Sequence, residues 1–152
     1  MSEIWKPHVA VAAVIERDGR FLLVEEEIAG QHVFNQPAGH LDPGESLVAA
    51  CARETLEESA WKFAPEALTG IYLLRIDEAS TYLRFTFCGR LIEHFPEQPL
   101  DKEILCTHWL TREEIAARRN RLRSPLVEVS IDDYMAGTRL PLSALKAYGL
   151  DH

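Results

Sequence analysis

Runs of apolar residues bounded by turn residues fill the first part of the chain. Residues 8–15 (HVAVAAVI) are apolar at nearly every position, which predicts a strand buried on both faces. A turn at 17–20 and a second apolar run, FLLV at 21–24, predict a hairpin. Residues 25–31 are charged and are predicted to form a loop, and Pro37 excludes a helix in the segment that follows.

A helical period begins after the loop 39–44, which has Gly at both ends and Pro43 between them. Such a loop can bring its backbone close to a ligand. Apolar and small side chains then recur at i, i+4, i+7 and i+8, which predicts a helix with one packed face: Val48, Ala52, Thr55 and Leu56. Three carboxylates lie together on another face of this helix: Glu54, Glu57 and Glu58.

The second half of the chain repeats the alternation of strands and helices. Residues 65–70 are predicted to be a connector, and Thr111 with Glu114 forms a capping box that opens a helix to about Arg119. Ser-Pro begins a further helix over 124–135. Three segments have the residue types of strands: 70–75, 81–91 and 104–110.

This order of elements predicts the fold class. Strands on both sides of a loop and helix, with more strands and helices after them, imply an α/β or α+β layered domain with a mixed sheet. With 152 residues the chain is long enough for a substantial core, and we expect one domain over residues 1–152.

Composition and charge exclude some function classes. The chain is 47% hydrophobic and 26% charged, as in an ordinary globular protein. Its net charge of −8 argues against a general binder of nucleic-acid polymers or membrane surfaces, which needs a basic field. An apolar stretch of about 18 residues and a basic-then-apolar leader are both missing from the sequence, so we expect a cytoplasmic protein.

Three cysteines lie far apart, without a CxxC pair and in odd number: Cys51, Cys88 and Cys106. This pattern predicts small buried residues in a reducing compartment, and it argues against zinc ligands or a disulfide framework.

The acidic helix face is the strongest candidate for chemistry. Carboxylates at this spacing repel one another by a few tenths of a kcal/mol per pair, and a magnesium ion with oxygen ligands offsets that repulsion. Arg53 can hold one of the carboxylates through a fork-shaped hydrogen bond. A solvated, salt-bridged helix face is the common alternative. The residues alone leave both interpretations open.

The spacing of the polar and glycine residues resembles the Nudix box, the signature of hydrolases that act on a diphosphate linked to another moiety. Six positions are in register: Gly39, Glu45, Arg53, Glu54, Glu57 and Glu58. Two positions depart, since the family usually has Gly at Ala60 and an aliphatic residue at Trp61. Gly normally ends this helix in a left-handed conformation, which Ala adopts at a cost of about 1 kcal/mol. The end of the helix is therefore in question.

The resemblance implies a Nudix-type three-layer α/β/α sandwich with a mixed sheet, on which the box helix packs. Segments between Lys6 and about Leu142 resemble one phosphatase group of the family: 6–9, 21–26, 35–40, 83–85 and 122–127. That group hydrolyses hydroxymethylpyrimidine diphosphate and thiamine diphosphate to the monophosphates, and removes terminal phosphate from nucleoside tri- and diphosphates. The implied partner is thus a small-molecule diphosphate, and we expect a monomer, with a dimer as the alternative.

The resemblance also implies a magnesium cofactor, with manganese as a substitute, that activates a water for attack on a phosphorus. Glu54 and Glu58 are then the firmest ligands, while Glu57 shares another ion or a water. The carbonyl of Ala38, just before Gly39, is a further ligand.

For the catalytic roles other than metal binding, the resemblance leaves more than one candidate residue or role. Glu45 is expected to pair with Arg53 and hold the loop against the helix, or to interact with the helix dipole in its first turn. The general base is Glu57, Glu54 or Glu103, the last at a position where some family members carry an additional acid. A plain surface charge is the alternative for Glu103.

Substrate contacts are predicted from residue type and position. Arg84 lies in an apolar strand, so we expect it on an open face toward phosphate or paired with a carboxylate. Arg123 can bind a phosphate oxygen or cap a local structure, and His40 can touch the phosphates or be an ordinary exposed loop residue. Three aromatic residues are candidates for stacking on a pyrimidine, with the core as the alternative: Phe34, Trp5 and Tyr72.

Three other functions compete with phosphatase activity. A nucleotide pyrophosphatase would cut between the α- and β-phosphates and release pyrophosphate. A Nudix-fold binding module without catalysis usually lacks box carboxylates, whereas this chain keeps all of them. A structural domain with an acidic face would show no effect of magnesium or manganese on its melting temperature.

Overall fold

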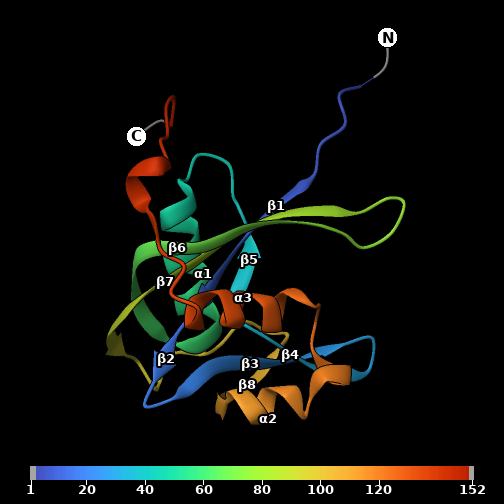
Figure 1. The fold of residues 1–152 in the computed structure, drawn as a ribbon, viewed down its shortest axis with the longest axis vertical. Helices are drawn as coiled ribbons and strands as arrows, with labels where there is room; N and C mark the ends of the chain where they lie inside the picture. The colour runs from blue at the N-terminus through green and yellow to red at the C-terminus, as the bar shows by residue number, and fades with distance from the viewer. Residues whose placement is uncertain (1–2, 151–152) are drawn as a thin grey trace.

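Two β-sheets form the framework of the computed structural model, which describes residues 3–150 (Figure 1). The terminal residues 1–2 and 151–152 of the expected domain lie outside this range. The first sheet has five strands in the order β5 (Ala38–His40), β1 (His8–Val14), β7 (Thr81–His94), β6 (Trp61–Arg75) and β9 (Leu140–Pro141). The second sheet has four strands: β2 (Glu16–Arg17), β3 (Arg20–Ile28), β4 (Gln31–Asn35) and β8 (Ile104–Thr111).

The first sheet is mixed, as the sequence predicts. Strand β1 pairs in parallel with β7, while the other pairings in this sheet are antiparallel. The nearly continuous apolar run of β1 suits this central place, because both of its faces are covered. Val11 and Ala13 contribute to one core cluster, and Val14 contributes to the other.

Helices cover the two faces of this sheet (Figure 1). Helix α1 (Leu47–Ser59) supplies Cys51 to the core cluster that contains Val11. Helix α3 (Leu126–Met135) supplies Ile131 to the cluster that contains Val14. Since successive strand residues point to opposite faces, α1 and α3 lie on opposite sides of β1. The layered α/β/α arrangement with a mixed sheet is therefore confirmed.

The remaining helical segments are short. The capping box at Thr111 is complete, since Thr111 accepts from the backbone of Glu114 and the Glu114 side chain accepts from the backbone of Thr111. Helix α2 (Arg112–Ala116) ends earlier than expected, and a 3₁₀ turn, η1 (Arg119–Arg121), follows it. A second 3₁₀ turn, η2, spans Leu142–Ala144. Within residues 3–150, no helix is long and apolar enough to cross a bilayer.

Two predicted loops are strands. Residues 25–31 extend β3 to Ile28, and a tight turn at Ala29 and Gly30, with φ of 52° and 78°, leads directly into β4. Residues 65–70 lie within β6, where register shifts occur around Pro65, because a bulge accommodates a residue that cannot donate to the ladder. In both places, pairing with distant strands outweighs local composition.

Helix α1 ends where the Nudix box requires. Ala60 has φ 61° and ψ 21°, and its N–H donates to the carbonyl of Leu56 over 2.9 Å. The alanine thus adopts the left-handed conformation that glycine usually supplies at this position, at a cost of about 1 kcal/mol.

The cysteines are only partly where the sequence predicts. Cys51 and Cys88 are buried, but Cys106 is exposed, so the expectation of three buried cysteines is wrong for Cys106. Cys106 shares a face of β8 with Leu110, which belongs to a core cluster, but the core does not extend along that face as far as Cys106. How far the core extends depends on strand pairing that composition does not reveal.

Candidate active site

Arg53 joins the loop before α1 to the acidic face of the helix. Its Nε and Nη2 donate to Glu45 Oε2 and Oε1 over 3.0 and 2.7 Å, so the predicted pairing is present. Glu45 also accepts from the backbone N–H of Asp42 over 2.8 Å. The Arg53 guanidinium holds the pKa of Glu45 below its usual value, so this carboxylate stays ionised.

The same guanidinium orders two more carboxylates. Arg53 Nη1 donates to Glu54 Oε1 over 2.8 Å and to Glu57 Oε1 over 2.9 Å, and Nη2 donates to the carbonyl of His40 over 3.0 Å. One planar group therefore fixes the loop and two helix side chains in a single arrangement.

A cluster of three carboxylates lies at the end of this face. One oxygen each from Glu54, Glu58 and Asp101 can be chosen so that all lie within 4.8 Å of one another. Glu58 is 8% exposed, and its Oε1 accepts from the backbone N–H of Ala38 over 2.9 Å. Burial, reinforced by the neighbouring carboxylates, raises the pKa of Glu58 to about 9. Burial also raises the pKa of Glu54.

Asp101 was not predicted from the sequence. It lies in the loop before β8, far from the box, and its backbone N–H donates to the carbonyl of Glu57 over 3.0 Å. Its signal in the sequence is weak, since 101–103 is an ordinary charged turn. Glu57 accepts a hydrogen bond from Arg53 and lies outside the three-carboxylate cluster, and its role in sharing another ion or a water stays a prediction.

The donor set of this cluster fits a hard divalent cation. Three carboxylates converge here, and the guanidinium of Arg53 lies beside one of them, Glu54. Carboxylate oxygens are the donors that Mg²⁺ and Mn²⁺ prefer. Gly39 keeps room for the cluster, because a Cβ there would lie 2.1 Å from the carboxyl carbon of Glu54. The backbone of the box loop therefore has to approach Glu54 without a side chain.

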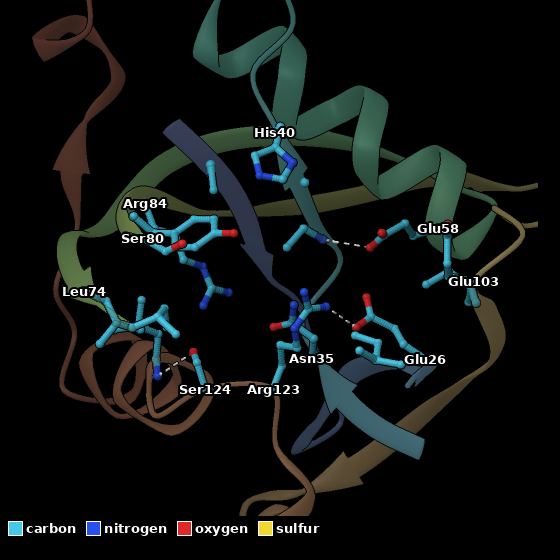
Figure 2. Close-up of a pocket in the computed structure, with 18 residues that line it drawn as sticks. Glu26, Asn35, His40, Glu58, Leu74, Ser80, Arg84, Glu103, Arg123 and Ser124 are labelled. Atoms are coloured by element: carbon cyan, nitrogen blue, oxygen red, sulfur yellow. Dashed lines mark hydrogen bonds and ion pairs between the residues drawn. The ribbon is translucent and has the colours of Figure 1, made fainter. Parts of the chain in front are cut away.

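A cavity of about 600 Å³ opens beside Glu58. In Figure 2, Glu58 and Glu103 lie on one side of this cavity, and Leu74 and Ser80 lie on the opposite side. Five of the predicted substrate or catalytic residues line its walls: His40, Glu58, Arg84, Glu103 and Arg123. The structure thus brings His40 and Arg123, which are 83 positions apart in the sequence, to the walls of one cavity.

Arg84 of β7 lines the cavity, but with 6% of its surface exposed it does not lie on a face open to bulk solvent. Its partner is also not a carboxylate: Nη2 donates to Gln36 Oε1 over 2.7 Å, and Gln36 in turn donates to the carbonyl of Val127 over 2.8 Å. Arg84 Nε has no hydrogen-bond partner among the described residues. Burial lowers the pKa of Arg84 to about 10, which still leaves it cationic at neutral pH.

Arg123 is anchored at the cavity by a residue that was not predicted. Its Nη1 donates to Glu26 Oε2 over 2.8 Å, and Glu26 is buried in β3. The backbone N–H of Arg123 donates to the carbonyl of Phe34 over 2.8 Å. Glu26 is the middle one of three successive glutamates in β3, so the sequence gives no signal that separates it from Glu25 and Glu27, and its partner is 97 residues away.

The aromatic candidates do not line the cavity. Phe34 is 3% exposed in a core cluster, Tyr72 donates to Asp133 over 2.5 Å, and Trp5 is 65% exposed. The proposed stacking role of Phe34 is therefore wrong, because its ring faces the core. Tyr82, which was not predicted, lines the cavity and stacks on His8 with ring centroids 5.0 Å apart.

Comparison with known proteins identifies the family. The model of the NUDIX domain matches residues 6–129. The chain belongs to the Nudix family. Phosphatase NudJ of Escherichia coli is 43% identical over 142 residues, which cover 93% of this chain and 92% of that protein. The phosphatase group that the sequence resembles is thus the NudJ type.

Solved structures agree with this assignment. A Nudix hydrolase from Nitrosomonas europaea is 50% identical, with a TM-score of 0.91 over 94% of this chain and 98% of that one. A UDP-X diphosphatase is 21% identical with a TM-score of 0.71 over 91% of this chain, which shows a shared fold only. The chain is therefore a Nudix hydrolase, an enzyme that acts on phosphorus-containing anhydrides.

Proposed function

We propose that this Nudix hydrolase is a magnesium-dependent phosphatase. Its substrates would be hydroxymethylpyrimidine diphosphate, thiamine diphosphate and nucleoside di- and triphosphates, from which it releases terminal phosphate. The observation that carries the proposal is the cluster of Glu54, Glu58 and Asp101 beside a cavity whose other walls hold two arginines. Similarity to Phosphatase NudJ supports phosphatase activity, and the substrates proposed are those that the resemblance of the sequence implies.

The acidic cluster would hold the cation. Glu54, Glu58 and Asp101 supply carboxylate oxygens, and the carbonyl of Ala38 is proposed as a further ligand. When bound, magnesium neutralises charge on the phosphoryl oxygens and acidifies a coordinated water. Arg53 keeps Glu54 from turning away, and the N–H of Ala38 does the same for Glu58.

The arginines would orient the substrate. Arg84 and Arg123 carry positive charge at the cavity, while the protein as a whole has a net charge of −8. Arg123 is tied to Glu26, which reduces its freedom to turn into solvent. His40 lies near Tyr82 at the cavity, with ring centroids 6.0 Å apart, and we propose that these two rings contact the substrate.

The general base would be Glu103 or Glu57. Glu103 lines the cavity, and the N–H of Glu27 fixes its backbone carbonyl over 3.1 Å. Glu57 lies beside the cluster, but Arg53 occupies its carboxylate. Glu103→Gln and Glu57→Gln should be compared by kcat at saturating magnesium, because loss of the base lowers kcat by about 10²–10⁴-fold.

One screen tests the function. Hydroxymethylpyrimidine diphosphate, thiamine diphosphate and common nucleotides are offered with magnesium, and phosphate is assayed with and without added inorganic pyrophosphatase. Phosphate without the added enzyme supports the proposal, whereas phosphate that depends on it would establish a pyrophosphatase. A Glu58→Gln variant with unchanged turnover would indicate a mechanism that does not use this cluster.

We further propose that the protein is a cytoplasmic monomer that acts on small molecules.

A further inference from the structure

A second group of ligand-type side chains lies on the four-stranded sheet, where Figure 1 shows β8 beside β3. Glu25 of β3 and Cys106 of β8 are directly opposite each other, and His108 shares a face with Cys106 because it is two residues further along β8. The next residue of β3, Glu26, points to the other face and pairs with Arg123 at the cavity. This cluster is therefore separate from the acidic one.

We propose that Glu25, Cys106 and His108 form a binding site for Zn²⁺ or another borderline-soft divalent cation. A thiolate, an imidazole and a carboxylate are the ligand types that zinc takes, whereas magnesium takes oxygen ligands. The two clusters of this protein thus differ in the metal that they select.

The donor atoms converge on one point. Cys106 Sγ lies 3.3 Å from His108 Nε2, His108 Nε2 lies 2.8 Å from Glu25 Oε1, and Cys106 Sγ lies 3.7 Å from Glu25 Oε1. Tetrahedral zinc with bonds of about 2.0–2.3 Å would separate such donors by about 3.4–3.6 Å. Both sulfur distances are within a few tenths of an ångström of that range, and the nitrogen–oxygen pair has to open by roughly half an ångström.

The same geometry argues against a nucleophilic cysteine. In a Cys-His-carboxylate arrangement, the sulfur and the carboxylate bind opposite nitrogens of the imidazole ring. Here both approach Nε2 of His108. A proton cannot be relayed across the ring in that arrangement, but one cation can accept all three donors.

The surroundings support the ligand positions and leave an entry path. The second oxygen of Glu25 lies 2.8 Å from His32 Nδ1 and 3.9 Å from Arg121 Nη2, so the carboxylate is held from behind. The ring of His108 packs on Phe34 with centroids 5.5 Å apart. Cys106 is exposed, which leaves a fourth coordination position open to solvent.

Binding would link the two strands without any redox change. The Cys106 thiol releases its proton to solvent as the sulfur–metal bond forms, and His108 binds as neutral imidazole. The resulting cross-link joins β3 to β8 next to the register shift between Glu25 and Glu26. We therefore expect the cation to raise the melting temperature.

Cobalt(II) alone tests the site, because a thiolate–cobalt bond gives a charge-transfer absorption in the near ultraviolet. The titration uses the Glu58→Gln background, in which the acidic cluster is impaired. We expect this absorption to saturate at one equivalent and to disappear when Zn²⁺ is added. Cys106→Ser should abolish it, and His108→Gln should weaken cobalt binding at least tenfold. Glu27→Gln is the matched control, since Glu27 is an exposed residue of β3 outside the cluster, and it should leave binding unchanged.

Three results would overturn the proposal: no thiolate absorption, an absorption that persists in Cys106→Ser, or equal affinity in a folded His108→Gln variant. Persistence would assign the sulfur to buried Cys51 or Cys88. Folding of each variant is checked by circular dichroism. Should His108→Gln fail to fold, two results decide. The first is the loss of the absorption in Cys106→Ser, and the second is a zinc-induced rise in melting temperature that is present in Glu27→Gln and absent in Cys106→Ser.

Discussion

Glu58 is the carboxylate whose environment most affects metal binding. Its pKa is raised to about 9 by burial, so in the metal-free protein it is protonated at neutral pH. A cation has to displace that proton, and its affinity should therefore rise with pH, up to tenfold per unit, until the pH passes about 9. Calorimetric titration of Mg²⁺ between pH 6 and 9, in buffers of different ionisation enthalpy, measures the slope and the released proton.

Glu57→Gln is the control for this titration. Glu57 binds Arg53 outside the three-carboxylate cluster, so the variant should keep the pH slope. Glu58→Gln has no proton to release there and should lose the slope as well as most of the affinity. A magnesium affinity that is flat from pH 6 to 9 in the unaltered protein would contradict this account of Glu58.

Gly39 matters because of the space that it leaves for Glu54. A Cβ at Gly39 would meet the carboxylate of Glu54, while the φ of Gly39 is not positive. We expect Gly39→Ala to displace that carboxylate and lower kcat/KM by about 10²-fold, since a shift of about 1 Å at a site can cost that much. Its free energy of unfolding should fall by less than about 1 kcal/mol, since a flexible side chain can move aside.

Gly44→Ala provides the opposite case for comparison. Gly44 has φ +82° and open space around its Cβ position, so alanine strains the backbone without touching Glu54. This variant should lose about 1 kcal/mol of stability and keep its kcat/KM. If Gly39→Ala keeps its activity, close packing on Glu54 is not required for catalysis.

At the scale of elements, the end of helix α1 depends on an alanine in a left-handed conformation. Ala60→Gly relieves about 1 kcal/mol of strain but removes a buried methyl group, which is worth about 0.8 kcal/mol. We therefore expect its free energy of unfolding to change by less than about 0.5 kcal/mol. Urea denaturation measures the change.

Ala50→Gly is the matched variant within the same helix. Ala50 is buried like Ala60, but it has helical geometry, so glycine brings no relief of strain. The loss of the methyl group and the lower helix propensity should together cost about 1.5–2 kcal/mol. Equal effects of the two substitutions would mean that the left-handed residue carries no strain.

At the scale of the whole molecule, the cation should stabilise the fold. Magnesium at a hundred times its dissociation constant adds about 2.7 kcal/mol, which corresponds to roughly 5–10 °C in melting temperature for a chain of this size. Glu58→Gln should show a much smaller shift. A melting temperature that does not respond to Mg²⁺ or Mn²⁺ would contradict a cation site at Glu54, Glu58 and Asp101, whereas zinc stabilisation through Cys106 is independent of this test.

Local pattern alone determined much of this protein. The apolar run of β1, the period of α1 and the capping box at Thr111 were predicted because each depends on residues within two turns of one another or on a single strand. The six Nudix-box positions and the pairing of Glu45 with Arg53 came from the resemblance to the family, and that resemblance also lies within one continuous stretch of loop and helix.

Only the tertiary structure decided which distant side chains meet. Asp101 joins Glu58 because the loop before β8 returns to the end of α1. Arg84 binds Gln36 because β1 pairs with β7 on one side and with β5, just after Gln36, on the other. Cys106 faces Glu25 through the register of β8 on β3. Strand register depends on contacts across the whole fold, and a shift of one residue would turn Arg84 or Cys106 to the other face of its sheet. For that reason the sequence determined the box and its helix, while the fold decided the third carboxylate, the orientation of the arginines and the second cluster of ligands.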